Sequence, residues 1–208
     1  AGPFGSGGNA ADPMPSRIKA PAGEQIAALA PLKAIEGRCY ACLGNHDHEA
    51  LATVETALAL NGIKLLVDDM TVAETAAGPV EILGFDFVWG DRAGHLRRVT
   101  ERFPRTEAMP RVAMLHDPGA FHHLPDGSAD LVLSGHTHGG QLGLLRLGLR
   151  GTVVSALSQV PDHGQWALGT ARLYVHRGTG HYGFPLRIGV PAERSLLHVH
   201  GLWRATAA

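Results

Sequence analysis

Three apolar segments of this chain each end in histidine, and this repeated pattern is the strongest constraint on its fold. The segments are "CLGNHDHE", "RVAMLHDP" and "ADLVLSGHTHGG", which span residues 42–49, 111–118 and 129–140. Each apolar run has the length of a buried strand. In α/β folds, ligands collect at the carboxyl ends of strands, because the sheet is rigid and the loops beyond it are free to vary. The pattern therefore predicts strands that deliver imidazoles to one edge of a sheet.

The order of the expected elements places the chain in the α/β class. Helical spacing of apolar residues predicts helices over 24–35, 49–60 and 91–103, with Pro31 expected to cut or kink the first. Strands are expected over 38–44, 63–68, 70–75, 80–88, 111–116, 129–135, 171–175 and 195–200, with a hairpin turn at Ala77-Gly78-Pro79. Helices and strands alternate early and strands dominate late, which favours layered sheets in a single domain over 1–208. Residues 1–22, rich in proline and glycine, are expected to form a loop.

Composition excludes several classes of protein. The net charge of −1 gives no electrostatic reason to expect binding to nucleic acid or to an anionic membrane. No run approaches the roughly 18 apolar residues of a membrane span. Thirteen histidines are many for this length, and imidazole is the commonest protein metal ligand, so the excess favours a metal site.

The two cysteines form one CxxC, at Cys39 and Cys42. Such a pair can be a redox dithiol or half of a zinc site. Alternatively, both are small apolar residues of a strand, where positions three apart point to opposite faces. No second CxxC completes a zinc cluster, so the structural interpretation is favoured and no disulfide is expected.

The donor types at the three strand ends suit a hydrolytic metal centre. Imidazole binds Zn, Fe, Mn or Ni, and the lack of thiolates argues against a structural zinc. The amide of Asn45 is a neutral ligand, which limits the negative charge near an anionic substrate. In extended chain, the spacing of His136 and His138 projects both imidazoles to one side.

Together these segments resemble a known family. "GNHD" (44–47), His116 and "GHTHGGQ" (135–141), in that order, are similar to the last three motifs of the calcineurin-like metallophosphoesterases. The closest resemblance is to the bacterial branch whose final motif is GHTHGGQ and whose tail has an RGxG loop before Pro-Leu-Arg, here 177–180 and 185–187. The resemblance covers residues 29–199. It implies a layered α-β-β-α sandwich of two mixed sheets, here lacking its first strand or strands, with a dinuclear metal centre between the sheet edges.

The resemblance also implies roles for individual residues. Asn45, His116 and His136 resemble ligands of one metal, and His138 resembles a ligand of the other. His46 is similar to the catalytic histidine that contacts the phosphate and assists the leaving group, so Asn45 and His46 are expected substrate-binding residues. Arg177 is added on a different ground, because the glycine loop that carries it is expected to face the substrate. Two divalent ions (Mn, Fe, Zn or Ni) would activate a water and neutralise phosphoryl charge.

The chain departs from the family pattern at its start. The family has an Asp-x-His and a Gly-Asp-x-x-Asp before these motifs, and neither is present. In the nearest alignment, Pro3 stands at the bridging aspartate and Ser6 at the acid that partners the phosphate-contacting histidine. One metal then keeps three of its usual four protein ligands and the other keeps one, so this chain alone is expected to bind one metal. Either it is a fragment of an active enzyme with its first motifs upstream, or it is a degenerate form.

The predicted function is that of a metal-dependent phosphoesterase, either a phosphodiesterase or a phosphomonoesterase. The expected substrate is a small or lipid-linked phosphate ester; no nucleic acid and no membrane span are expected. The location would be cytoplasmic, or at a membrane through a segment upstream of the chain. The alternative is a catalytically impaired binding protein of the same fold with one incomplete metal site. Gln141 is expected to orient a neighbouring ligand, whereas His122 and His123 are expected on a short helix outside the site.

Overall fold

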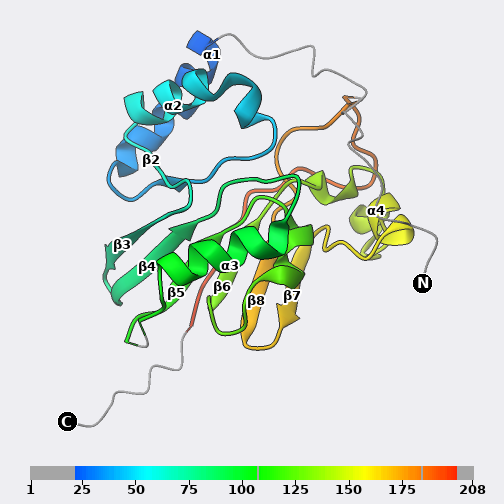
Figure 1. Cartoon of the computed structure of the whole chain (residues 1–208). Helices are drawn as coiled ribbons and strands as arrows, with labels where there is room; N and C mark the ends of the chain where they lie inside the picture. Colours follow the sequence, from blue (N-terminus) through cyan, green and yellow to red (C-terminus); the bar gives the residue numbers. More distant parts are fainter. Residues whose placement is uncertain (1–21, 107, 184, 201–208) are drawn as a thin grey trace.

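A six-stranded mixed sheet forms the centre of the computed structural model, which describes residues 22–106, 108–183 and 185–200 (Figure 1). Its strand order is β3-β4-β5-β6-β8-β7. The inner strands β4, β5, β6 and β8 are mutually parallel, and an antiparallel strand lies at each edge. The strands are β3 (Asp69–Thr75), β4 (Gly78–Gly84), β5 (Arg111–Met114), β6 (Leu131–Ser134), β7 (Gly164–Leu168) and β8 (Ala171–Val175).

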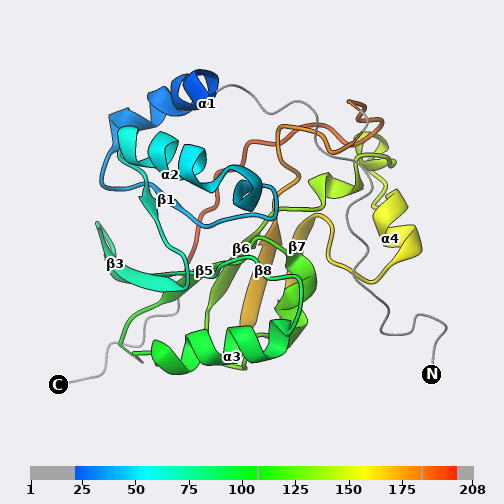
Figure 2. The same cartoon turned by 45° about the horizontal axis from the view of Figure 1, so that its top comes forward.

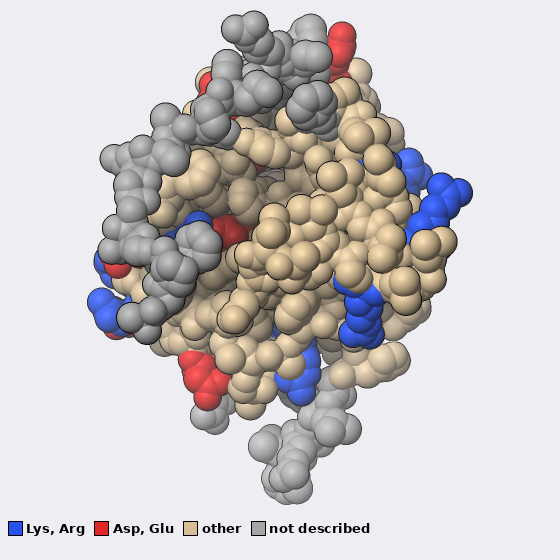
Figure 3. Space-filling model, turned by 90° about the vertical axis from the view of Figure 1, so that its right-hand side faces the viewer, with Lys and Arg blue, Asp and Glu red and all other residues tan. Residues whose placement is uncertain are grey.

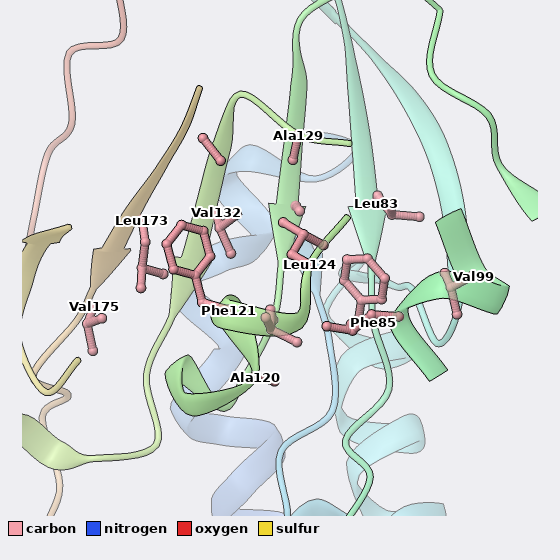
Figure 4. Packing of buried hydrophobic residues seen from close by; sticks show 14 residues of the cluster. Leu83, Phe85, Val99, Ala120, Phe121, Leu124, Ala129, Val132, Leu173 and Val175 are labelled. Carbon is pink, nitrogen blue, oxygen red and sulfur yellow. The ribbon is translucent and has the colours of Figure 1, made fainter. Parts of the chain in front are cut away.

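One face of this sheet carries the main apolar core. Helix α3 (Arg92–Arg102) and the 3-10 turn η3 (Pro118–His123) cover it. Phe121 of η3 and Leu96 of α3 are each 1% exposed and belong to this core. Figure 4 shows Phe121 next to Val132 and Leu173 of the strands. Asp91 caps α3, because its side chain accepts a hydrogen bond from the backbone N–H of Gly94.

The N-terminal part of the described chain builds a smaller unit above the sheet (Figures 1 and 2). Strands β1 (Tyr40–Ala41) and β2 (Lys64–Leu65) form a parallel pair, joined through η2 (Asp47–Ala50) and α2 (Leu51–Leu60). Helix α1 (Ala22–Leu29) packs on α2 and continues as η1 (Ala30–Ile35), because Pro31 ends regular α-helical bonding. The amide of Asn61 donates to the carbonyl of Ile26 (3.0 Å) and fixes this contact.

The α/β class and most of the predicted elements are confirmed. Two expectations for the tail are wrong: residues 195–200 form no strand, and the edge strand β7 was not predicted. The remaining elements follow β6, namely η4 (His138–Gly140), η5 (Leu145–Leu147) and α4 (Val153–Leu157). Pro3, Ser6 and the rest of the expected loop before Ala22 lie outside the described residues, and Ala22 itself begins α1. Within the described ranges, no helix has the length and apolar character needed to cross a bilayer.

Candidate metal centre

The loops that follow β1, β5 and β6 meet at the edge of the six-stranded sheet that faces α2 (Figure 1). His116 follows β5, His136 follows β6, and Asn45 follows β1. The parallel ladder between β5 and β6 continues past both strands, since Leu115 N–H bonds to Leu133 C=O and Gly135 N–H bonds to His116 C=O. This register sets the two histidines side by side.

The side chains of Asn45, His116 and His136 converge on one point. The Oδ1 atom of Asn45 lies 3.1 Å from Nε2 of His116 and 3.2 Å from Nδ1 of His136, and the two ring nitrogens are 3.3 Å apart. Two ligands at about 2.1 Å from a metal ion lie about 3.0–3.4 Å from each other in octahedral or tetrahedral geometry. The three donors therefore have the spacing of a shared metal ligand set.

His116, His136 and His138 all favour the neutral form of imidazole, which is the form that binds metal ions. Burial and, to a smaller extent, the neighbouring His136 lower the pKa of His116 to about 4, while Asp117 opposes the shift. Burial also lowers the pKa of His136 and of His138. A metal ion binds the neutral form of imidazole. The lowered pKa values keep these side chains neutral at neutral pH, so a metal ion does not have to displace protons from them.

The aromatic ring of Phe87 forms the apolar wall of this cluster. Its centroid lies 6.0 Å from that of His116 and 5.9 Å from that of His136. Phe87 is 7% exposed, whereas Trp89, packed edge-on against it at 4.8 Å, is 69% exposed. The sequence argument missed both residues, although the aromatic run at the end of a predicted strand was the available signal.

The backbone of the "GHTHGGQ" loop adopts conformations that are uncommon for residues with side chains. His136, His138 and Gln141 have φ values of 65°, 51° and 53°, in the left-handed region. Such residues persist only where the surroundings hold them, and they concentrate at functional sites. Gly44 is required for a different reason: a Cβ there would lie 2.7 Å from the His116 ring.

His138 lies next to the cluster with an unpartnered atom. Its Nδ1 is buried and has no hydrogen-bond partner among the described residues. A buried polar atom without a partner is costly, and a bound metal ion would satisfy it. In the described ranges, however, no three His, Cys, Asp or Glu side chains form a metal-binding group. The residues present thus fit one metal at the Asn45–His116–His136 donors, with His138 as a single donor toward a second.

Two side chains tie the "GHTHGGQ" loop to the segment 177–190. The guanidinium of Arg187 donates to the carbonyl oxygens of His138, Arg177, Gly180 and Val190. Gln141 forms a pair of hydrogen bonds with the backbone N–H and C=O of Tyr182, the latter at 2.9 Å. Gln141 therefore fixes the 177–183 loop rather than a ligand side chain, and the role of Arg187 was not foreseen from sequence.

His46 has an acidic partner that the sequence argument did not identify. Its Nδ1 lies 2.8 Å from Oε1 of Glu49, one turn along η2. The ring of Tyr182 lies over His46, with centroids 5.6 Å apart. The turn that carries His46 is closed by Asp47, whose carboxylate accepts from Gly44 N–H at 2.7 Å. The i, i+3 spacing of His46 and Glu49 in a polar turn was the signal available in the sequence.

Arg177 lies beside the loop, and its guanidinium contacts Glu193. Its Nε and backbone N–H both donate to Oε2 of Glu193 at 2.9 Å. These bonds, with those from Tyr174 and Ser195, hold the pKa of the Glu193 carboxyl at about 2 against the opposing effect of burial. Arg177 also packs over Gly139, where a Cβ would be 2.7 Å from its Cγ.

The cysteines and the remaining histidines lie outside the cluster. Cys39 and Cys42 are free thiols, and burial raises the pKa of Cys42 to about 12. A thiol with so high a pKa is a poor nucleophile, which supports the structural interpretation. His122 and His123 are exposed on η3, as expected.

Comparison with known proteins identifies bacterial relatives. The chain is 30% identical over 178 residues to the metallophosphoesterase YkoQ of Bacillus subtilis, covering 80% of this chain and 61% of the relative. It is 32% identical over 166 residues to the phosphodiesterase YaeI of Escherichia coli, covering 77% and 57%. It is 28% identical over 113 residues to the UDP-2,3-diacylglucosamine pyrophosphatase LpxG of Chlamydia trachomatis, covering 51% and 33%. The chain thus spans less than two thirds of the length of each of these relatives. No family model and no solved structure matches it.

Proposed function

Because this chain belongs to the calcineurin-like metallophosphoesterase superfamily, we propose that it supplies the histidine-containing part of the metal site of a metal-dependent phosphoesterase. The reaction is hydrolysis of a P–O bond in a phosphodiester or phosphomonoester. The observation that carries the proposal is the triangle of donor atoms on Asn45, His116 and His136, with edges of 3.1–3.3 Å.

Asn45, His116 and His136 would hold one divalent ion, and His138 would contribute to a second. The metal centre supplies, when loaded, an activated water as nucleophile and neutralisation of charge on the phosphoryl oxygens. Mn, Fe, Zn and Ni all accept this donor set. Asn45 adds no negative charge, which keeps the site attractive to a phosphate.

The protein residues around this centre divide the remaining work. His46 donates a proton from Nε2 to the leaving oxygen as its bond to phosphorus breaks, while Glu49 holds Nδ1 (2.8 Å) and orients the ring. Phe87 excludes water behind the two ligand imidazoles. Arg177, in the adjacent loop, is the proposed contact for a substrate oxygen. The substrate class we propose is a small or lipid-linked phosphate ester, in line with the name of the relative LpxG.

Hydrolysis of bis-p-nitrophenyl phosphate with added Mn, using the full-length protein, tests the proposal. His136→Ala is expected to abolish turnover while the thermal unfolding midpoint of the metal-free protein stays near that of wild type. His122→Ala, an exposed histidine on η3, is the matched control and keeps full activity. No turnover by wild-type protein with metal bound would refute the proposal.

One observation favours a second candidate, a binding protein of the same fold with an incomplete metal site. No described carboxylate completes a ligand group with these histidines. Calorimetric titration with Mn distinguishes the two. One site per chain without turnover in the full-length protein supports the binding protein, and two sites with turnover support the enzyme.

A further inference from the structure

The segment that follows the metal-site loop exposes an unusual number of large aliphatic side chains. Leu147 is 73% exposed and Leu157 is 80% exposed. A second stretch lies against this segment, since Gly143 N–H donates to Ile188 C=O (2.9 Å) and Arg146 N–H donates to Gly189 C=O (2.8 Å). We call the two stretches together the leucine surface: Leu142, Leu144, Leu147, Leu149, Val153, Leu157, Leu186 and Ile188. Clusters of this kind on a folded domain mark interaction sites.

The backbone beneath the leucine surface is hydrogen-bonded within the protein. Leu144 N–H bonds to Gly151 C=O (2.8 Å), Val153 N–H to Leu142 C=O (2.9 Å), and Leu147 N–H to Leu144 C=O (2.9 Å). Thr152 caps α4 through a reciprocal pair of bonds with Ser155. Because these polar groups are already paired, the side chains can enter an apolar phase without the cost of stripping water from free backbone groups.

The charged residues in the first stretch of the leucine surface are basic. Between residues 131 and 161 the chain has no Asp or Glu, and its charged residues there are Arg146 and Arg150, both exposed. Figure 3 shows on this side of the molecule a broad area of uncharged residues, with both basic and acidic side chains around it. The net charge of −1 gave no reason to expect binding to an anionic surface. That value is an average over the whole chain, however, and binding depends on the electrostatic field at the surface that makes the contact.

The composition of this surface favours a bilayer over a protein partner. Protein interfaces are enriched in aromatic residues, methionine and arginine, and of these only arginine occurs between 142 and 157. Aliphatic side chains flanked by arginine are the pattern of segments that lie in the interface of a membrane. We propose that the leucine surface docks on an anionic lipid bilayer.

The position of the surface links it to the metal centre. Leu142 directly follows Gln141, the last residue of the "GHTHGGQ" loop, so the bilayer would contact the protein beside His138. Lipid phosphates at the membrane surface would then lie near the metal ligands. This last consequence rests on the proposed phosphoesterase function, whereas docking itself does not.

Flotation of the full-length protein with lipid vesicles tests the docking. Wild-type protein is expected to bind vesicles of phosphatidylcholine with phosphatidylglycerol, and to bind pure phosphatidylcholine much more weakly. The double variant Leu147→Glu/Leu157→Glu should bind at least about tenfold more weakly. Arg146→Gln/Arg150→Gln should lose about fivefold per charge on the anionic vesicles alone. Leu60→Glu, on α2 and 54% exposed, is the matched control and should bind as wild type.

Several outcomes would overturn this proposal. They are no vesicle binding by wild type, equal binding by Leu147→Glu/Leu157→Glu, or equal loss in Leu60→Glu. Light scattering that shows a dimer, dissociated by the double variant, without vesicle binding would assign the surface to a second copy of the chain. His136→Ala should still bind vesicles, so failure of the phosphoesterase proposal is distinguishable. The double variant should also keep wild-type hydrolysis of bis-p-nitrophenyl phosphate, which shows that it is folded.

Discussion

Arg187 holds the carbonyl oxygen of His138 with its Nη2, at 3.1 Å, and the same nitrogen lies 2.9 Å from the carbonyl oxygen of Arg177. One guanidinium thus joins the turn that carries His138, a proposed metal ligand, to the loop opposite. His138 needs such support, since its φ of 51° lies where residues with a Cβ are strained. Partners that orient ligands in this way are worth about 10- to 100-fold in metal affinity or activity.

Replacing Arg187 by Lys should therefore weaken metal binding by about 10- to 100-fold. Lysine keeps the charge but cannot bond four carbonyl oxygens in the fixed geometry of a guanidinium. Calorimetric titration with Mn measures the effect. Arg194→Lys, at an exposed position nearby, should bind metal as wild type does. Unchanged metal affinity in Arg187→Lys would show that the turn around His138 keeps its conformation without the guanidinium.

Replacing Glu49 by Gln should slow substrates with poor leaving groups more than substrates with good ones. Glu49 orients the ring of His46, and only a poor leaving group needs a proton as it departs. We expect a loss in kcat of about tenfold for phenyl phosphate and little loss for p-nitrophenyl phosphate.

His46→Asn should give the same pattern with a larger loss, of about 100-fold or more on phenyl phosphate. Glu55→Gln, exposed on α2, is the control and should leave both substrates unaffected. An equal loss on both substrates in Glu49→Gln would indicate that Glu49 merely stabilises the turn.

The metal-free protein should lose stability as the pH falls from about 6.5 to about 4. The pKa of His116 is about 4 in the folded state and about 6.5 in the unfolded chain, so the unfolded chain binds more protons between these values. The free energy of unfolding then decreases as the pH falls, by up to about 3 kcal/mol from His116. His136 and His138 act in the same direction.

Urea unfolding at pH 7 and pH 4.5 in the presence of a chelator checks this dependence. His116→Asn should remove part of the difference between the two pH values. Below about pH 4.5 Glu193 adds a further loss, because its folded pKa of about 2 makes it a stabilising carboxylate only while it is charged. A stability that does not change between pH 7 and pH 4.5 would contradict the burial of the imidazoles.

Replacing Glu81 by Gln should destabilise the fold by about 3–5 kcal/mol. Glu81 and Arg111 are each 1% exposed, and Nε of Arg111 donates to Oε2 of Glu81 at 2.7 Å. Removing one charge leaves the other buried without its partner. The urea midpoint measures the loss, and Glu74→Gln, on the exposed edge strand, is the control. Adding Arg111→Met should recover part of the loss, and a further loss would contradict this account.

The elements that sequence predicted are those with a local signal. The hairpin at Gly78, the helix that begins near Asp91 and the strands before His116 and His136 all follow from turn chemistry, helical spacing or apolar runs. The edge strand β7 has a mostly exposed burial pattern and pairs only with β8, so no alternation marked it. Residues 197–200 alternate apolar and polar side chains, yet no described strand pairs with them.

The sequence predicted the candidate metal-binding residues but not the residues that hold them in place. The parallel strands β5 and β6 bring His116 to His136, whereas Asn45 follows β1 of the separate two-stranded pair and reaches them through packing of the smaller unit on the sheet. Arg187 reaches His138 over 49 residues, and Phe87 reaches His136 from another strand; such contacts depend on packing that no local pattern encodes. The assignments of His46, His138 and Arg177 to catalysis, metal and substrate remain predictions.

The distances between the donor atoms of Asn45, His116 and His136 depend on the register in which β5 pairs with β6. The strands align Val112 with Leu131 and Met114 with Leu133, and this offset brings His116 to His136. A slip of one residue would move one imidazole by about 3.3 Å along its strand and turn its face over. Such a misassembled sheet could still bury its leucines and valines, but it would have no common point for three ligands. Metal binding would therefore distinguish protein with the correct strand register from misaligned protein that has the same secondary structure content.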